Sequence, residues 1–69
     1  MNESKIKRTL REHGGEVYVE RDYYACADFP SPAKAHDARR ELQAADVYVI
    51  VTCTRLIAYY YRKESDERS

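Results

Sequence analysis

The chain has no long apolar run and few of the residues that mark special chemistry. Its 69 residues include two cysteines, two prolines, two glycines and no tryptophan. No segment approaches the roughly 18 apolar residues of a membrane-spanning helix. Residues 1–5 lack the apolar core of a secretory signal. We therefore expect a cytoplasmic protein that does not associate with membranes.

An excess of charge of either sign is also missing. Twelve Lys and Arg residues balance twelve Asp and Glu residues. No overall field therefore attracts the nucleic-acid backbone or an anionic membrane. Charge is biased only locally, with residues 1–13 mildly basic and residues 14–30 acidic.

Catalytic, metal-binding and phosphate-binding motifs are absent from the sequence. Two cysteines without a CxxC spacing or a nearby histidine pair do not indicate a zinc site. Cys26 and Cys53 are predicted to be reduced, half-buried strand residues, and whether they are ever oxidised stays open. His13 and His36 have no nucleophile or carboxylate partner that the sequence indicates. We expect no enzyme activity, no cofactor and no small-molecule substrate.

Tyrosine is the abundant residue, with seven copies, while only thirteen Val, Ile, Leu, Met and Phe residues are present. A chain of this size is near the lower limit for an independent hydrophobic core. Residues 1–63 are predicted to form one small domain of marginal stability, followed by a disordered tail over residues 64–69. Tyrosines, a second copy or a partner are expected to complete the burial of apolar surface.

Two segments have the pattern of helices. Residues 4–13 place apolar side chains at i and i+4 and end at Gly14 and Gly15, which is typical of a helix closed by glycine. Ser31 and Pro32 supply an N-cap and a first-turn residue for a second helix over residues 32–45. Alanines on one side of this helix are small enough to let it lie close to a sheet.

Four segments have the pattern of strands. Residues 17–20 alternate apolar with polar side chains and the pattern resumes at residues 23–27, which predicts a hairpin, with one bent strand as the alternative. Residues 47–51 and 56–62 predict a second pair. The fold class is therefore α+β, a four-stranded antiparallel sheet with two helices packed on one face, in the order α-β-β-α-β-β. Strand order stays open. The triplet Val-Tyr-Val at 17–19 and 47–49 suggests two helix-hairpin units.

Directly opposed residues of a hairpin point to the same face of the sheet. An even loop centred on residues 53 and 54 therefore gives the second hairpin two apolar layers. The helix-facing layer is predicted to hold Val47, Val49, Val51, Leu56, Ala58 and Tyr60, and the other layer Tyr48, Ile50, Ile57, Tyr59 and Tyr61. The same parity places Val17, Val19, Tyr24 and Cys26 toward the helices and Tyr18, Tyr23 and Ala25 away from them.

An antiparallel sheet with one solvated face should carry polar residues on that face, and the second hairpin does not. We therefore predict a partner-binding face formed by Tyr18, Tyr23, Tyr48, Ile50, Ile57, Tyr59 and Tyr61. Its partner is predicted to be another protein or a second copy, which would make a homodimeric structural domain. The alternatives are that the rings merely lie flat on the strands, or that the first helix crosses to this side.

Binding of single-stranded RNA or DNA is the main alternative function, since tyrosines on a sheet can stack on unpaired bases. The candidate phosphate contacts are Lys5, Lys7, Arg8, Arg11, Arg55 and Lys63. The basic-glycine-aromatic signature of RRM proteins is absent, however. Glu20 is expected on the same face as the tyrosines and would oppose a phosphate backbone.

One part of the chain resembles known small proteins. Residues 28–51 read DFPSPAKAHDARRELQAADVYVIV, and this layout of strand, capped alanine-rich helix and strand is similar to that of small phage-encoded inhibitor proteins of the anti-CRISPR type. The resemblance implies a stoichiometric, non-enzymatic inhibitor that occupies a surface of a host nucleoprotein complex. It identifies no functional residue.

Overall fold

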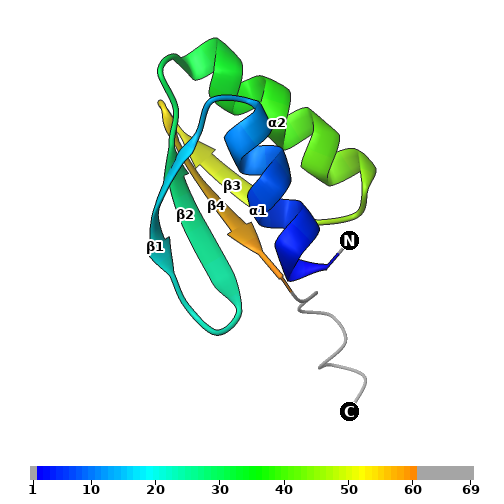
Figure 1. Ribbon diagram of the computed structural model, residues 1–69. Helices are drawn as coiled ribbons and strands as arrows, with labels where there is room; N and C mark the ends of the chain where they lie inside the picture. The colour runs from blue at the N-terminus through cyan, green and yellow to red at the C-terminus, as the bar shows by residue number, and fades with distance from the viewer. Residues whose placement is uncertain (1, 61–69) are drawn as a thin grey trace.

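The computed structural model describes residues 2–60, which form two helices and a four-stranded antiparallel sheet (Figure 1). The elements are α1 (Glu3–Glu12), β1 (Glu16–Glu20), β2 (Tyr24–Asp28), α2 (Pro32–Ala44), β3 (Tyr48–Thr52) and β4 (Arg55–Tyr59). The strands lie side by side in the order β1-β2-β4-β3. Both helices cover one face of this sheet, so the predicted fold class is confirmed. The tail predicted over residues 64–69 lies outside the described residues.

Each helix begins at a polar cap residue. The side chain of Asn2 accepts a hydrogen bond from the backbone N–H of Lys5 at 2.9 Å. Ser31 Oγ accepts one from the backbone N–H of Lys34 at 3.3 Å, and Pro32 follows as the first helical residue. Such caps satisfy backbone donors that the first turn leaves without a partner. The predicted start of the second helix is confirmed.

Helix α1 ends in a Schellman turn, in which the residue after the cap adopts a positive φ. The N–H of Gly14 donates to Arg11 O at 3.0 Å, and the N–H of Gly15 donates to Leu10 O at 2.9 Å. Gly14 has a φ of 89°. Glycine is suited to this position because it has no Cβ to clash with the backbone.

Helix α2 ends in the same turn without a glycine. The N–H of Asp46 donates to Gln43 O at 2.9 Å, the N–H of Val47 donates to Leu42 O at 3.0 Å, and Asp46 has a φ of 69°. Since Asp46 holds the place of Gly14, Val17 corresponds to Val49 and not to Val47. The Val-Tyr-Val triplets are therefore not equivalent positions in the two halves of the fold.

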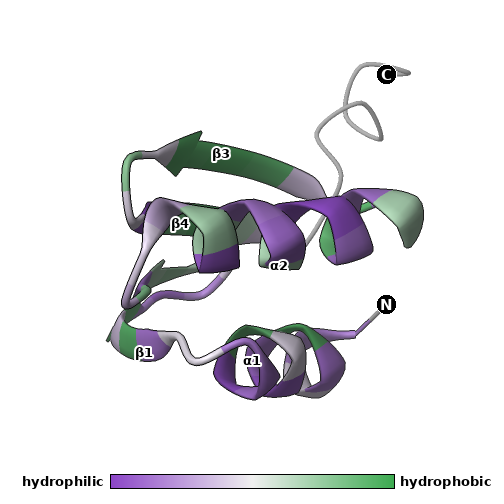
Figure 2. Cartoon of the chain, turned by 90° about the horizontal axis from the view of Figure 1, so that it is seen from above, coloured by the Kyte–Doolittle hydropathy of each residue, from purple (hydrophilic) through white to green (hydrophobic). Residues whose placement is uncertain are grey.

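The core lies between the helices and the sheet and has a floor of small side chains. Ala25, Ala27 and Ala58 on the two central strands are fully buried, and Ala35 and Ala38 of α2 are fully buried as well. Larger side chains fill the rest of the core, which comprises Ile6, Leu10, Phe29, Leu42, Val47, Val49, Leu56 and Tyr60. In Figure 2, α1 and β3 lie at opposite margins of the molecule with α2 between them.

The second hairpin has the predicted layers. Val51 pairs with Leu56 and Val49 pairs with Ala58. The helix-facing residues are buried apart from Val51, which is half-buried at the margin of the sheet. Tyr48 and Ile50 alternate with them and are exposed on the other face. Tyr61 lies outside the described residues.

β1 and β2 form the predicted hairpin, but the prediction of its layers was wrong. A β-bulge shifts the register, so that Val17 pairs with Ala27 whereas Val19 pairs with Cys26. The extra residue at 18 reverses the alternation, and Val17 packs against the core cluster while Val19 does not. The corrected positions are Ala25, which faces the helices, and Val19, Tyr24 and Cys26, which face away from them.

Candidate functional site

The sheet face turned away from the helices, here called the outer face, carries a row of tyrosines across the strands. Tyr24 pairs with Tyr59, and Tyr59 pairs with Tyr48 on its other side. This register sets the three side chains next to one another. Their ring centroids are 5.7 Å apart between Tyr24 and Tyr59 and 5.3 Å apart between Tyr59 and Tyr48. Tyr23 extends the row, with its ring centroid 5.8 Å from that of Tyr24. We call Tyr23, Tyr24, Tyr59 and Tyr48 the tyrosine row.

Two further rows complete the outer face. The second row is Val19, Cys26, Ile57 and Ile50, which lie opposite one another in β1, β2, β4 and β3, next to the tyrosine row. The third row is polar and consists of Asp28, Arg55 and Thr52. The outer face therefore changes from aromatic to aliphatic to charged along the direction of the strands.

Tyr18 joins the polar end of the outer face because of the bulge. The guanidinium carbon of Arg55 lies 5.9 Å from the centre of the Tyr18 ring, which is the distance of a cation-π contact. Glu16 pairs with Asp28 on the neighbouring strand. Two carboxylates and one guanidinium thus lie at this end of the face.

The outer face exposes a large apolar surface. Tyr18, Tyr23 and Tyr48 are each about half exposed, and Ile50 is 40% exposed. A fully enclosed tyrosine buries about 150 to 250 Å², so these four residues alone expose on the order of 400 Å². The largest apolar patch of a typical monomer is about 300 to 600 Å² and is often functional. Half-buried Tyr59 and Ile57 add to it.

The structure brings most of the predicted face residues together. Tyr48, Ile50, Ile57 and Tyr59 are direct neighbours through strand pairing, Tyr23 is joined through Tyr24, and Tyr18 through Arg55. The alternative that the first helix crosses to this side is wrong, since Ile6 and Leu10 of α1 belong to the core on the helix side.

Val19, Tyr24 and Cys26 belong to the outer face and were missed. The neighbours of Tyr24 and Cys26 in the face come from β4, and pairing between β2 and β4 follows from strand order, which one sequence does not specify. The bulge at residue 18 carries no glycine or other local signal of its own. Only the excess of tyrosine at 23–24 and 59–61 could have indicated that β2 and β4 share an aromatic row.

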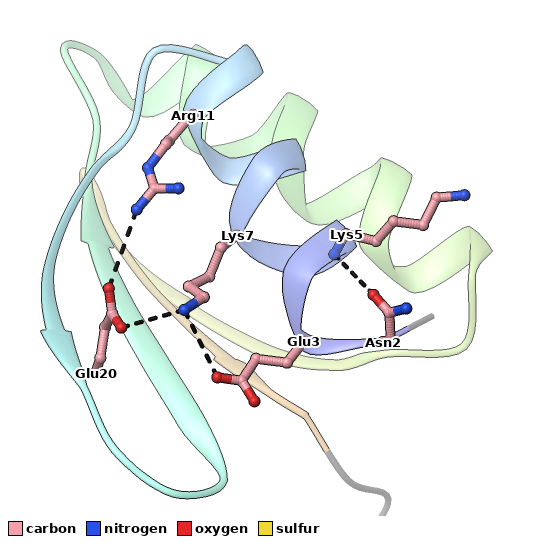
Figure 3. Close-up of polar contacts among 6 residues, drawn as sticks. All are labelled: Asn2, Glu3, Lys5, Lys7, Arg11 and Glu20. Atoms are coloured by element: carbon pink, nitrogen blue, oxygen red, sulfur yellow. Dashed lines mark hydrogen bonds and ion pairs between the residues drawn. The ribbon is translucent and has the colours of Figure 1, made fainter.

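The basic residues of α1 do not share a surface with the tyrosines. Glu20 pairs with the buried Ala25 and so lies on the helix side, which corrects its predicted place on the outer face. Figure 3 shows Lys7 and Arg11 directed at Glu20; Lys7 Nζ lies 3.2 Å from Glu20 Oε1, and Arg11 Nη2 lies 4.0 Å from Glu20 Oε2. Lys7 also lies 3.6 Å from Glu3.

The other predicted phosphate contacts are dispersed. Lys5 and Arg8 are exposed on α1, and Lys5 points away from the Lys7 and Glu20 pair in Figure 3. Lys63 lies outside the described residues. Within residues 2–60, Arg55 is therefore the one predicted phosphate contact that lies beside the tyrosines.

Two groups on the helix side have shifted pKa values. The hydrogen bond from Lys7 to Glu20 raises the pKa of the Lys7 ammonium above its ordinary value of 10.5. Burial raises the pKa of the Tyr60 hydroxyl above its ordinary value of 10.0. Both groups keep their protons at neutral pH, so neither is poised for proton transfer there.

His13 has a carboxylate partner that the sequence did not indicate. His13 Nε2 lies 2.8 Å from Glu41 Oε1, which joins the end of α1 to α2. No serine, threonine or cysteine side chain in the described part of the chain hydrogen-bonds to this imidazole. Cys26 is half-buried as predicted, whereas Cys53 is exposed in the turn between β3 and β4, so the prediction of a half-buried Cys53 was wrong.

Neither a metal site, nor a membrane-spanning helix, nor a known relative assigns a function to the described part of the chain. Among residues 2–60, no three His, Cys, Asp or Glu side chains gather as a metal site would require. No helix within that range is long and apolar enough to cross a membrane. Comparisons with protein-family models, curated proteins and solved structures found no significant match.

Proposed function

We propose that this protein is a non-enzymatic binding module that holds a protein partner on its outer face. The observation that carries the proposal is the tyrosine row, in which four rings contact one another on a face that the protein's own helices leave open. Tyrosine combines a large contact area with few rotatable bonds and a hydroxyl that can bond a partner's backbone. Ile50 and Ile57 beside the row supply aliphatic contact.

The charges favour a protein partner over a nucleic acid. Arg55 lies among the carboxylates of Glu16 and Asp28, so this end of the face has no net positive charge to attract phosphates. Lys7 and Arg11 lie on the other side of the sheet and are engaged with Glu20. Binding of single-stranded nucleic acid through base stacking is the second candidate, and it is favoured only by the rings themselves.

The resemblance to small phage-encoded inhibitors suggests a narrower version of the proposal. In that version the partner is a protein surface of a host nucleoprotein complex, bound in the cytoplasm with one copy of this chain per site. A flat aromatic face suits such a role because it occupies a surface without needing a deep pocket.

The test changes Tyr48 and Tyr59 together to Ser. A photo-crosslinking residue at position 48 first captures the partner, with the same residue at the exposed position 40 on α2 as the matched control. Binding of the purified partner is then measured by calorimetry. Each hot-spot tyrosine is worth about 2 kcal/mol or more, so the double variant should bind more than about 100-fold more weakly. A Tyr48→Phe and Tyr59→Phe variant should retain most of the affinity.

Three results would contradict the proposal. Equal cross-linking from positions 40 and 48 would show that the outer face is not selective. Loss of the folded circular dichroism spectrum in the Ser variant would show that the two rings are structural. Tight binding of labelled single-stranded RNA or DNA that weakens steeply with salt would favour the second candidate instead.

A further inference from the structure

Strand β3 is an edge strand whose outer margin is free of any other described element. It lies at one end of the order β1-β2-β4-β3, and Figure 2 shows it at the margin opposite α1, with no helix beyond it. Val51 on this strand is only half-buried although it faces the helices. The helices of this chain therefore do not cover the margin.

The backbone groups that point outward from β3 can be identified from the neighbouring strands. The N–H of Tyr60 donates to Tyr23 O, and Thr54 O accepts from the N–H of Phe29. The backbone N–H and C=O groups of even-numbered residues in and next to β4 therefore hydrogen-bond toward β2. Those of the odd-numbered residues hydrogen-bond toward β3. Arg55, Ile57 and Tyr59 pair with Thr52, Ile50 and Tyr48.

The intervening residues of β3 are therefore left facing outward. Val49 and Val51 direct one N–H and one C=O each away from the molecule. No hydrogen bond to these groups occurs within residues 2–60.

The two edges of the sheet differ in how they are protected. Strand β1 has charged residues at both ends, Glu16 and Glu20, and a β-bulge in its middle. Charges and bulges are the usual devices that prevent an edge strand from pairing with another chain. Strand β3 reads Tyr-Val-Ile-Val-Thr, with no charge, glycine or proline and no bulge. The β1 edge is thus protected against pairing with another chain, whereas β3 has the residue composition of a strand that pairs.

We infer that β3 pairs antiparallel with β3 of a second copy of this chain, about a twofold axis through Ile50. This register places Val49 opposite Val51 of the second copy, so that all four outward N–H and C=O pairs form hydrogen bonds. Tyr48 lies opposite Thr52 of the second copy. No charged residue of β3 meets its own copy, so the strand is complementary to itself.

The geometry of the sheet supports this register over the one centred on Val49. A twofold axis perpendicular to the sheet keeps the helices of both copies on the same side. A helix-facing residue of one copy must therefore lie opposite a helix-facing residue of the other. Centring the pair on Val49 would require the N–H of Val47, which already donates to Leu42 O at 3.0 Å. Pairing about Ile50 extends both outer faces into one eight-stranded surface. The contact is narrower than a standard interface, so we expect micromolar affinity.

The test is cysteine cross-linking in a full-length chain that also carries Cys26→Ser and Cys53→Ser. Opposed residues of a pair without ladder hydrogen bonds have Cα atoms about 4.5 Å apart, which a disulfide can span. Ile50→Cys should therefore cross-link to itself under mild oxidation at roughly 10 to 100 µM. Tyr48→Cys and Thr52→Cys are the matched controls. Each alone should form no disulfide-linked dimer, because its cysteine lies opposite a different residue of the second copy, whereas their equimolar mixture should cross-link.

A charge exchange provides a second, reversible test. Ile50→Lys and Ile50→Glu each place like charges on the axis, and each should raise the dissociation constant at least about tenfold in sedimentation experiments. Mixing the two variants should restore association. Unchanged circular dichroism spectra show that both remain folded. A monomeric parent chain at these concentrations would overturn the inference, and so would a disulfide in Thr52→Cys alone.

Discussion

Replacing Cys53 by glycine should stabilise the protein although it removes a side chain. Cys53 is the first of two residues in the turn between β3 and β4, and its φ of 59° lies in the left-handed region. Thr54, the second residue, does not have a positive φ. A positive φ at the first position alone is the pattern of a type II′ turn, which prefers glycine there.

The expected magnitude is the difference between two opposing effects. A left-handed conformation costs a residue with a Cβ about 1 to 2 kcal/mol, and glycine adds about 0.4 to 1 kcal/mol of chain entropy to the unfolded state. The Cys53→Gly variant should therefore gain about 0.5 to 1 kcal/mol in free energy of unfolding. For a domain of this size that raises Tm by about 2 to 8 °C. Cys53→Ala should be close to neutral because it keeps the strained φ.

Thr54→Gly is the matched control in the same turn. Its φ offers no strain to relieve, and Thr54 Oγ1 donates a hydrogen bond to Asp28 Oδ1 at 2.9 Å that glycine lacks. This variant should lose about 1 to 2 kcal/mol. Urea unfolding followed by circular dichroism measures all three variants. If Cys53→Gly is destabilised as much as Thr54→Gly, the backbone conformation of the turn does not control its stability and the reasoning is refuted.

Three further predictions concern the packing of the core and the pH dependence of the free energy of unfolding. Gly15→Ala should lower the free energy of unfolding by about 1 to 3 kcal/mol, because the new Cβ would lie 2.7 Å from the Phe29 ring. The double variant with Phe29→Leu should lose less free energy of unfolding than the sum of the two single losses. The free energy of unfolding should fall as pH rises above about 10, because the pKa values of Lys7 and Tyr60 are raised in the folded state and the unfolded chain loses these protons first. Tyr60→Phe should make this decline shallower, and a flat profile in the parent protein would contradict the assignment. Ala58→Val should cost about 1 to 3 kcal/mol by overpacking, whereas Ile57→Val on the outer face should change stability by under about 1 kcal/mol.

The second hairpin could be predicted from the sequence because its turn and its register are local. Two residues separate Thr52 from Arg55, so every pair along β3 and β4 follows by counting outward. The helices could be predicted for the same reason, since Ser31 and Gly14 act within a few residues of their own positions.

The first hairpin could not be predicted because a single extra residue reverses its faces. The bulge at Tyr18 depends on how Glu16 and Glu20 pair with Asp28 and Ala25 at the same time, and no local residue type marks it. Glu20 was consequently expected among the tyrosines instead of beside Lys7. The composition of the tyrosine row depends on β2 lying against β4, which is a contact between segments about thirty residues apart in the chain.

The alanine floor beneath the helices separates two evolutionary constraints within the same strands. Ala25, Ala27 and Ala58 of β2 and β4 must stay small for the helices to dock, while Tyr24 and Tyr59 of the same strands contact each other on the opposite face. Substitutions at the outer-face positions of β2 and β4 should therefore cost less free energy of unfolding than substitutions of these alanines. The proposed partner could therefore change through substitutions on the outer face alone, with the packing of the helices on the alanines left intact.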